Sequence, residues 1–162
     1  MIIGLSIENF TILHVIISLI AIASGLIVLA GMLRARRLPG WTALFLVTTI
    51  LTSVTGFMFP ISGLTPGIVF GLISVVILVI ALNALYVKHL AGAWRWIYVT
   101  TALIALYLNV FVLIVQSFQK VPALQKLAPT QSEPPFSVTQ GVLLVAFLIL
   151  GIMAARRFRP TP

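Results

Sequence analysis

The sequence predicts an all-α integral membrane protein with five transmembrane helices, and three observations lead to this fold class. Of the 162 residues, 61% are hydrophobic and only 7% are charged, whereas charged residues make up about 25% of an ordinary soluble domain. The apolar residues form five runs, each close to the ~20 residues that a helix needs to cross the hydrocarbon core. The basic residues stand in short clusters at the ends of these runs. We therefore expect a single transmembrane domain over residues 1–162.

The five predicted helices follow one another with short connections. The first ends at a cluster of arginines and the second ends at Pro60. Thr65 and Pro66 have the pattern of an N-cap and first helical residue before the third helix. Ser137 and Gln140 have the spacing of a capping box at the start of the fifth. The predicted helices cover residues 10–33, 41–59, 67–87, 94–118 and 138–155.

One substantial loop, residues 120–136, joins the fourth helix to the fifth. Its first half, VPALQKLA, places Val121, Leu124 and Leu127 on one side, which favours a short helix lying at the membrane interface. Its second half, PTQSEPP, is rich in proline and is expected to be extended. Loops of this length often carry a function, although a simple tether between the two helices is the alternative.

The fourth helix is expected to lie at the centre of the bundle. It carries polar or small residues in steps of three or four, which places them on one helical face. Lipid cannot satisfy such groups, so this face must look at protein or water. The face consists of Tyr98, Thr101, Ala105, Asn109, Val112, Gln116 and Gln119.

The distribution of basic residues predicts the orientation in the membrane. Eight of the ten Lys and Arg fall on one side if the helices alternate in direction, and both acids, Glu8 and Glu133, fall on the other. The positive-inside rule then places the amino terminus outside and the carboxyl terminus in the cytoplasm. The arginines at the helix ends are expected to fix this topology and to contact anionic lipid head groups. They are Arg34, Arg36, Arg37, Arg156, Arg157 and Arg159.

An internal repeat is a further prediction. A shift of 52 residues lays residues 37–59 over residues 89–111 with seven identical pairs in 23, among them Gly40/Gly92 and Thr49/Thr101. Both units run in the same direction, so a duplication would give a parallel tandem repeat of two hairpins, with the fifth helix added. Coincidence between two apolar hairpins is the alternative, since short pattern matches carry a false-positive risk.

Several polar residues are expected at a similar depth in the outer half of the membrane. A histidine and two carboxamides at one level could bind a small polar ligand or the head group of a quinone. Hydrogen bonding between helices is the alternative, and such bonds contribute roughly 0.6 kcal/mol each. The candidate ligand-binding residues are His14, Ser18, Thr52, Asn109 and Gln116.

Other functional classes are disfavoured by what the sequence lacks. It has no cysteine and only two acids, and it contains none of the common catalytic motifs, so no catalytic or metal-binding residue is expected. The basic clusters do not form one folded face, which argues against nucleic-acid binding. His14 and His89 fall at opposite ends, so they cannot ligate one haem within the chain. No cofactor is therefore expected, with quinone or a single-histidine haem as the alternative.

Small residues recur at the spacing typical of packed membrane helices. Such pairs occur at Ala21 and Gly25, at Gly67 and Gly71, and at Gly151 and Ala155. They permit close approach of two backbones, either within one chain or between chains. We therefore expect the partners to be the lipid bilayer and either a second copy of the chain or other membrane subunits.

The sequence resembles uncharacterised small bacterial inner-membrane proteins of four or five helices. The resemblance is carried by His14 with the small residues Ser18, Ala21 and Gly25 after it, by the turn RARRLPGW, and by the segment KVPALQKLAPTQSEPPF. It covers nearly the whole chain and implies a multi-pass protein of the bacterial inner membrane, without an established activity. The leading functional hypothesis is a non-enzymatic accessory or scaffold subunit. The alternatives are a small-molecule binder or facilitator and a quinone- or haem-associated redox subunit.

Overall fold

The computed structural model describes residues 1–60 and 62–160, and this part of the chain is helical without a strand. Five of its helices are long and apolar enough to cross a membrane, as the sequence predicts. The elements are α1 (Ile7–Leu33), α2 (Pro39–Phe57), α3 (Pro66–Leu82) with the π-helical turn η1 (Asn83–Val87), α4 (Trp94–Lys120), α5 (Pro122–Leu127) and α6 (Pro134–Arg157).

Most helix boundaries agree with the sequence-based expectation to within three residues. Thr65 is the N-cap of α3, where its side chain accepts a hydrogen bond from the Ile68 amide at 3.4 Å. The first helix begins earlier than expected, at Ile7, because the Ser6 side chain caps it by accepting from the Asn9 amide. The expected short helix in loop 120–136 is also present as α5.

The predicted start of the last helix is wrong. We expected the helix from residue 138 with a capping box at Ser137 and Gln140, but α6 begins at Pro134 and both residues lie inside it. Proline has no amide hydrogen to lose at the first helical position and its φ already suits a helix. Pro134 and Pro135 therefore start the helix instead of extending the loop, and Glu133 takes the N-cap position.

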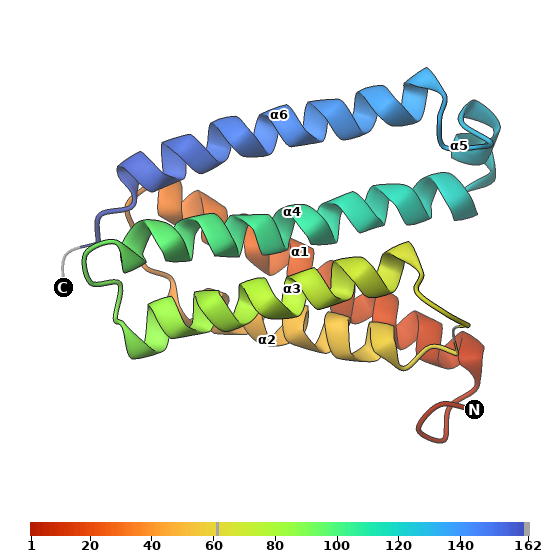
Figure 1. Cartoon of the computed structure of the whole chain (residues 1–162), viewed down its shortest axis with the longest axis horizontal. Helices are drawn as coiled ribbons and strands as arrows, with labels where there is room; N and C mark the ends of the chain where they lie inside the picture. Colours follow the sequence, from red (N-terminus) through yellow and green to blue (C-terminus); the bar gives the residue numbers. More distant parts are fainter. Residues whose placement is uncertain (61, 161–162) are drawn as a thin grey trace.

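Helix α4 is the centre of the bundle, as predicted. It packs against α3 along one side and α6 along another, and it also contacts α1 (Figure 1). Of the five spanning helices it has the largest buried share, and α6 has the smallest. The core lies where α1, α2, α3 and α4 converge, and it includes Phe45, Leu78, Tyr98 and Leu106.

Close approach between helices depends on two of the small residues singled out above. A Cβ atom added at Gly25 would lie 2.6 Å from Leu106 Cδ1, and one added at Gly71 would lie 2.7 Å from Phe57 Cε1. By contrast, a Cβ at Gly67 would meet only the Thr65 hydroxyl beside it. Gly25 and Gly71 therefore leave room for side chains of neighbouring helices.

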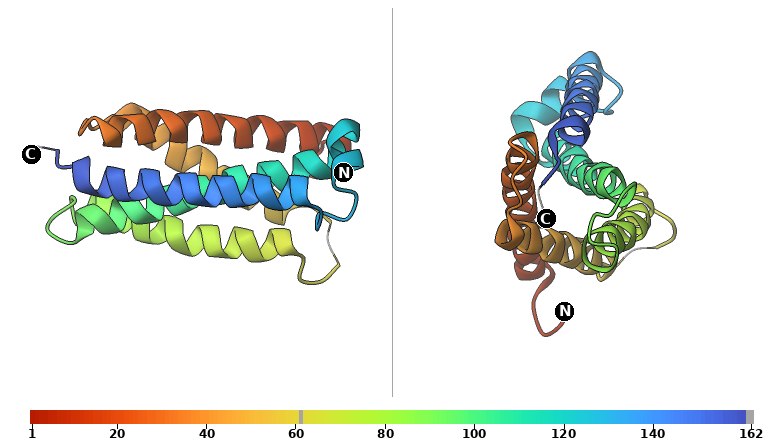
Figure 2. Two further views of the ribbon diagram at one scale, coloured as in Figure 1. Left: turned by 90° about the horizontal axis from the view of Figure 1, so that it is seen from above. Right: turned by 90° about the vertical axis from the view of Figure 1, so that its left-hand side faces the viewer.

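Helix α6 lies at the edge of the bundle, where it packs against α4 and α1 (Figure 2). Only Ala154 in it is buried. Just beyond its last turn, Phe158 enters the core, with its ring centroid 6.1 Å from that of Tyr98. The Arg95 guanidinium of α4 donates to the Ala155 carbonyl at 2.7 Å and to the Phe158 carbonyl at 2.6 Å. Arg95 therefore satisfies carbonyls that the end of α6 would leave unpaired.

Candidate functional site

His14 lies at the contact between α1 and α2. Its Nδ1 is 2.7 Å from the Thr55 hydroxyl oxygen. That hydroxyl donates its own hydrogen to the Leu51 carbonyl at 2.7 Å, so it accepts from His14 and the imidazole proton is assigned to Nδ1. The Phe59 ring stands edge-on to the imidazole, with centroids 5.3 Å apart. The histidine is thus oriented by the neighbouring helix.

Asn109 links α4 to α2 in the middle of the bundle. Its Nδ2 donates to the Thr49 hydroxyl at 3.2 Å, and Thr49 is fully buried. A carboxamide in this position would be costly if it faced lipid without a partner. This hydrogen bond therefore gives one of the polar groups of Asn109 a partner inside the bundle.

Within the described part of the chain, the other three candidate ligand-binding residues form no hydrogen bond with a side chain of another helix. The Ser18 hydroxyl donates to the His14 carbonyl at 2.7 Å, and the Thr52 hydroxyl donates to the Thr48 carbonyl at 2.8 Å. Gln116 is exposed near the far end of α4. The five residues therefore divide between two interhelical contacts, two bonds within a helix and one exposed position. Ligand binding by this set stays a prediction.

Three glutamines join α4 to the segment after it, and the sequence analysis gave two of them, Gln119 and Gln140, other roles. The Gln131 side chain donates to the Val115 carbonyl at 2.9 Å and accepts from Gln119 at 3.3 Å. Gln140 Nε2 donates to the Phe111 carbonyl at 3.2 Å, while its Oε1 is buried with no donor among the described residues. No periodic or spacing signal identifies these contacts, because they depend on where the loop folds back.

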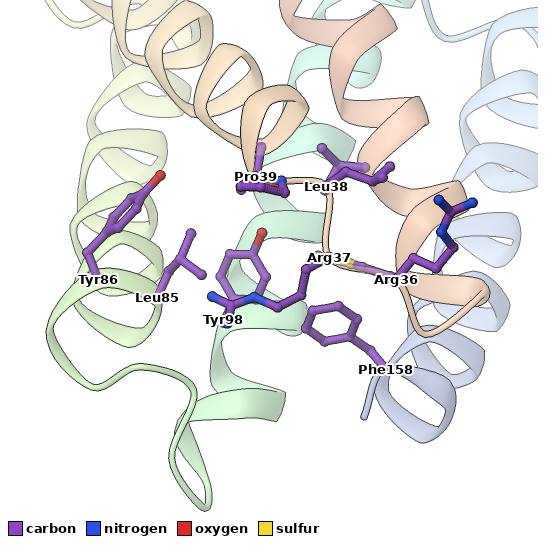
Figure 3. Close-up of a pocket in the computed structure, with 11 residues that line it drawn as sticks. Arg36, Arg37, Leu38, Pro39, Leu85, Tyr86, Tyr98 and Phe158 are labelled. Carbon is purple, nitrogen blue, oxygen red and sulfur yellow. The ribbon is translucent and has the colours of Figure 1, made fainter. Parts of the chain in front are cut away.

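A small cavity of about 50 Å³ lies at the opposite end of the bundle from these glutamines (Figure 3). We call this end the basic end, because the loop after α1, the turn after η1 and the residues at the end of α6 lie there and carry the clusters of Lys and Arg. The cavity is walled by apolar side chains and carries polar groups from the loop after α1 and from α2, η1 and α4. It is lined by Val28, Met32, Arg36, Arg37, Leu38, Pro39, Thr42, Leu85, Tyr86, Tyr98 and Phe158.

The sequence predicted the components of this cavity separately and for other roles. Arg36 and Arg37 were expected to set topology, and Tyr98 was expected on the central face of the fourth helix. None of His14, Ser18, Thr52, Asn109 and Gln116 lines it. Its assembly depends on the loop after α1 folding over the start of α4, which sequence spacing does not reveal.

The two histidines are far apart in the structure. His14 lies in the first half of α1, whereas His89 lies in the turn between η1 and α4 at the basic end. The described residues hold no group of three or more His, Asp or Glu side chains placed to share a metal ion. Quinone or haem binding stays an untested alternative.

No known protein family, curated protein or solved structure matches the chain. The resemblance to small bacterial inner-membrane proteins therefore stays an expectation, and function is inferred from the geometry described above.

The carboxylate of Glu133 gives the loop before α6 a pH dependence. The Thr130 hydroxyl donates to it at 2.7 Å, and the Thr130 and Ser132 amides also donate to it. These bonds favour the charged form, so they lower the pKa of Glu133 below its ordinary value, with the Thr130 hydroxyl as the main cause. The contribution of these bonds to the stability of the loop is complete above the ordinary pKa of glutamate. It is lost as the pH falls through the lower pKa that Glu133 has in the folded protein.

We predict that the amide resonance of Thr130 will shift in NMR spectra when this carboxylate is protonated, with a midpoint below the ordinary glutamate pKa of about 4.3. Glu133→Gln is the matched control, and its Thr130 resonance is expected to stay constant over the same pH range. A midpoint at or above the ordinary value would contradict the hydrogen bonds described here.

Proposed function

We propose that this chain is a non-enzymatic accessory or scaffold subunit of a complex in the bacterial inner membrane. The observation that supports this proposal most is the use made of the polar side chains within the spanning helices. His14 binds Thr55 and Asn109 binds Thr49, each across a helix–helix contact. These side chains hold helices together, as expected for a packed bundle. In an open ligand channel they would face the lumen instead.

The magnitudes favour the same interpretation. A hydrogen bond between membrane helices contributes roughly 0.6 kcal/mol on average, so two such bonds add modest stability to a bundle that close packing already holds. Leaving the same groups unpaired in lipid would cost several kcal/mol each. Pairing is therefore sufficient reason for these residues to be present without a ligand.

The finer topology is also part of the proposal. We infer an amino terminus outside and a cytoplasmic carboxyl terminus from the asymmetry of basic residues. We also infer a parallel repeat of two hairpins with α6 added. This arrangement rests on the match between residues 37–59 and residues 89–111.

One observation favours the small-molecule alternative, a polar pocket open to the outside. Gln140 Oε1 is buried with no donor among the described residues, and an unpaired buried carbonyl oxygen calls for a partner. An ordered water or a ligand donor would satisfy it. If Gln140→Met leaves the stability of the purified protein unchanged, this alternative loses its support.

Purification in a mild detergent tests the subunit role. We expect light scattering to give a protein mass above 17.6 kDa, and mass spectrometry to identify either this chain alone or a second membrane protein in fixed ratio. Membranes from cells that lack the chain, taken through the same steps, are the control. A monomer with no protein enriched over that control would contradict the proposal.

A further inference from the structure

We propose that the cavity at the basic end binds a phosphate group, supplied either by the head group of an acidic phospholipid or by free phosphate. This inference goes beyond the subunit role and does not depend on it. It rests on the polar groups that line the cavity, on the charge balance at this end of the bundle, and on the size and place of the cavity.

The polar groups that line the cavity are hydrogen-bond donors from separate elements. Arg37 lies in the loop after α1, Thr42 in the first turns of α2 and Tyr98 near the start of α4. Figure 3 shows the Arg37 side chain extending toward the Tyr98 ring, whereas Arg36 turns to the other side. A guanidinium and two hydroxyl-bearing residues lining one cavity suit an anion with several oxygens, because arginine can donate two parallel hydrogen bonds to phosphate.

No acidic side chain lies near enough to neutralise these arginines. Glu8 lies in the first turn of α1 and Glu133 caps the start of α6, and both positions are at the end of the bundle opposite the cavity. In addition, α2 begins at Pro39 on the cavity wall without a side-chain cap, so its first free amides add partial positive charge. The anion that neutralises these arginines must therefore be something other than an acidic side chain of this protein.

The size and position of the cavity limit which anions can bind in it. A volume of about 50 Å³ holds roughly four water-sized groups, which fits a phosphate and excludes a nucleotide or a sugar. Trp41 and Trp96 are exposed at the same end, and exposed tryptophans mark the level of lipid head groups. Basic pockets between membrane helices at this level suit the head groups of acidic lipids.

Native mass spectrometry of the detergent-solubilised protein with added phosphatidylglycerol tests the inference. We expect Arg37→Gln to weaken retention of this lipid about tenfold, since a charge-assisted pair is lost. Tyr98→Phe keeps the buried ring and removes only a hydroxyl, so we expect a smaller loss with an unchanged melting temperature. Arg34→Gln is the matched control, because Arg34 is in the same basic cluster but does not line the cavity.

A second arm separates the two sources of phosphate. If inorganic phosphate displaces phosphatidylglycerol from the wild-type protein only at concentrations far above that of the lipid, the site belongs to the lipid. If the protein binds inorganic phosphate in an Arg37-dependent manner and does not prefer phosphatidylglycerol over phosphatidylcholine, the site belongs to free phosphate. Equal losses in Arg37→Gln and Arg34→Gln would mean diffuse attraction to a basic surface, and the proposed site would be wrong.

Discussion

Replacing Arg95 by methionine will loosen the end of α6 and destabilise the bundle by about 2–4 kcal/mol, because two hydrogen bonds from a charged donor are lost. The guanidinium donates to the carbonyls of Ala155 and Phe158. Methionine has a similar length and no donor, so both carbonyls would be left without this partner. We expect a lower melting temperature in detergent.

A cross-linking measurement locates the effect at α6. The chain has no cysteine, so thiols can be introduced singly or in pairs. A Cβ at Gly151 would lie 3.7 Å from Leu103 Cδ1, so cysteines at these two positions should react with a short bifunctional reagent. We expect Arg95→Met to reduce the yield, whereas Arg156→Met, at an exposed position of the same end, should not. Equal yields in both variants would contradict the anchoring role of Arg95.

Replacing Gly25 by leucine will prevent α1 from packing against α2 and α4. Even a Cβ atom there would lie 2.6 Å from Leu106 Cδ1 and 2.9 Å from the Phe45 ring. Both side chains are 1% exposed, so neither can move aside without disturbing the core. Overpacking of this kind costs about 1–3 kcal/mol, and more where the neighbours are enclosed. We expect Gly25→Leu to accumulate poorly in membranes and to aggregate on extraction.

Gly141→Leu is the matched control for this change. Gly141 lies in the spanning helix α6, and a Cβ atom there would meet nothing within 4 Å. The same substitution should therefore leave yield and melting temperature close to wild type, as measured by size-exclusion chromatography. Equal damage in the two variants would show that leucine disturbs the helices themselves and that the close approach at Gly25 is not the cause.

Much of the fold can be predicted from the sequence because the bilayer imposes length and composition on each spanning helix. The polar face of the fourth helix predicted its central place, and this face is buried at Tyr98, Thr101 and Ala105. Toward Gln116 and Gln119 the face leaves the bundle and is exposed. Periodicity alone does not show where a helix passes beyond its neighbours.

The contacts that the sequence did not reveal join segments far apart in the chain. Arg95 donates hydrogen bonds to carbonyls 60 and 63 residues away along the chain. The start of α6 was placed too late because a proline-rich stretch was interpreted as loop, although proline suits the first turn of a helix. The cavity at the basic end required three elements to meet, and only the structure brings Arg37, Thr42 and Tyr98 together.

The central claim is that the polar groups inside the bundle serve helix packing. The measurement that tests it most directly is labelling of Asn109→Cys with a membrane-impermeant maleimide in intact membranes. Ser132→Cys, at an exposed loop position, is the positive control. We expect Ser132→Cys to be labelled and Asn109→Cys to be protected until the protein is denatured. Labelling of Asn109→Cys at a rate close to that of Ser132→Cys would show a water-filled pocket and would contradict the claim.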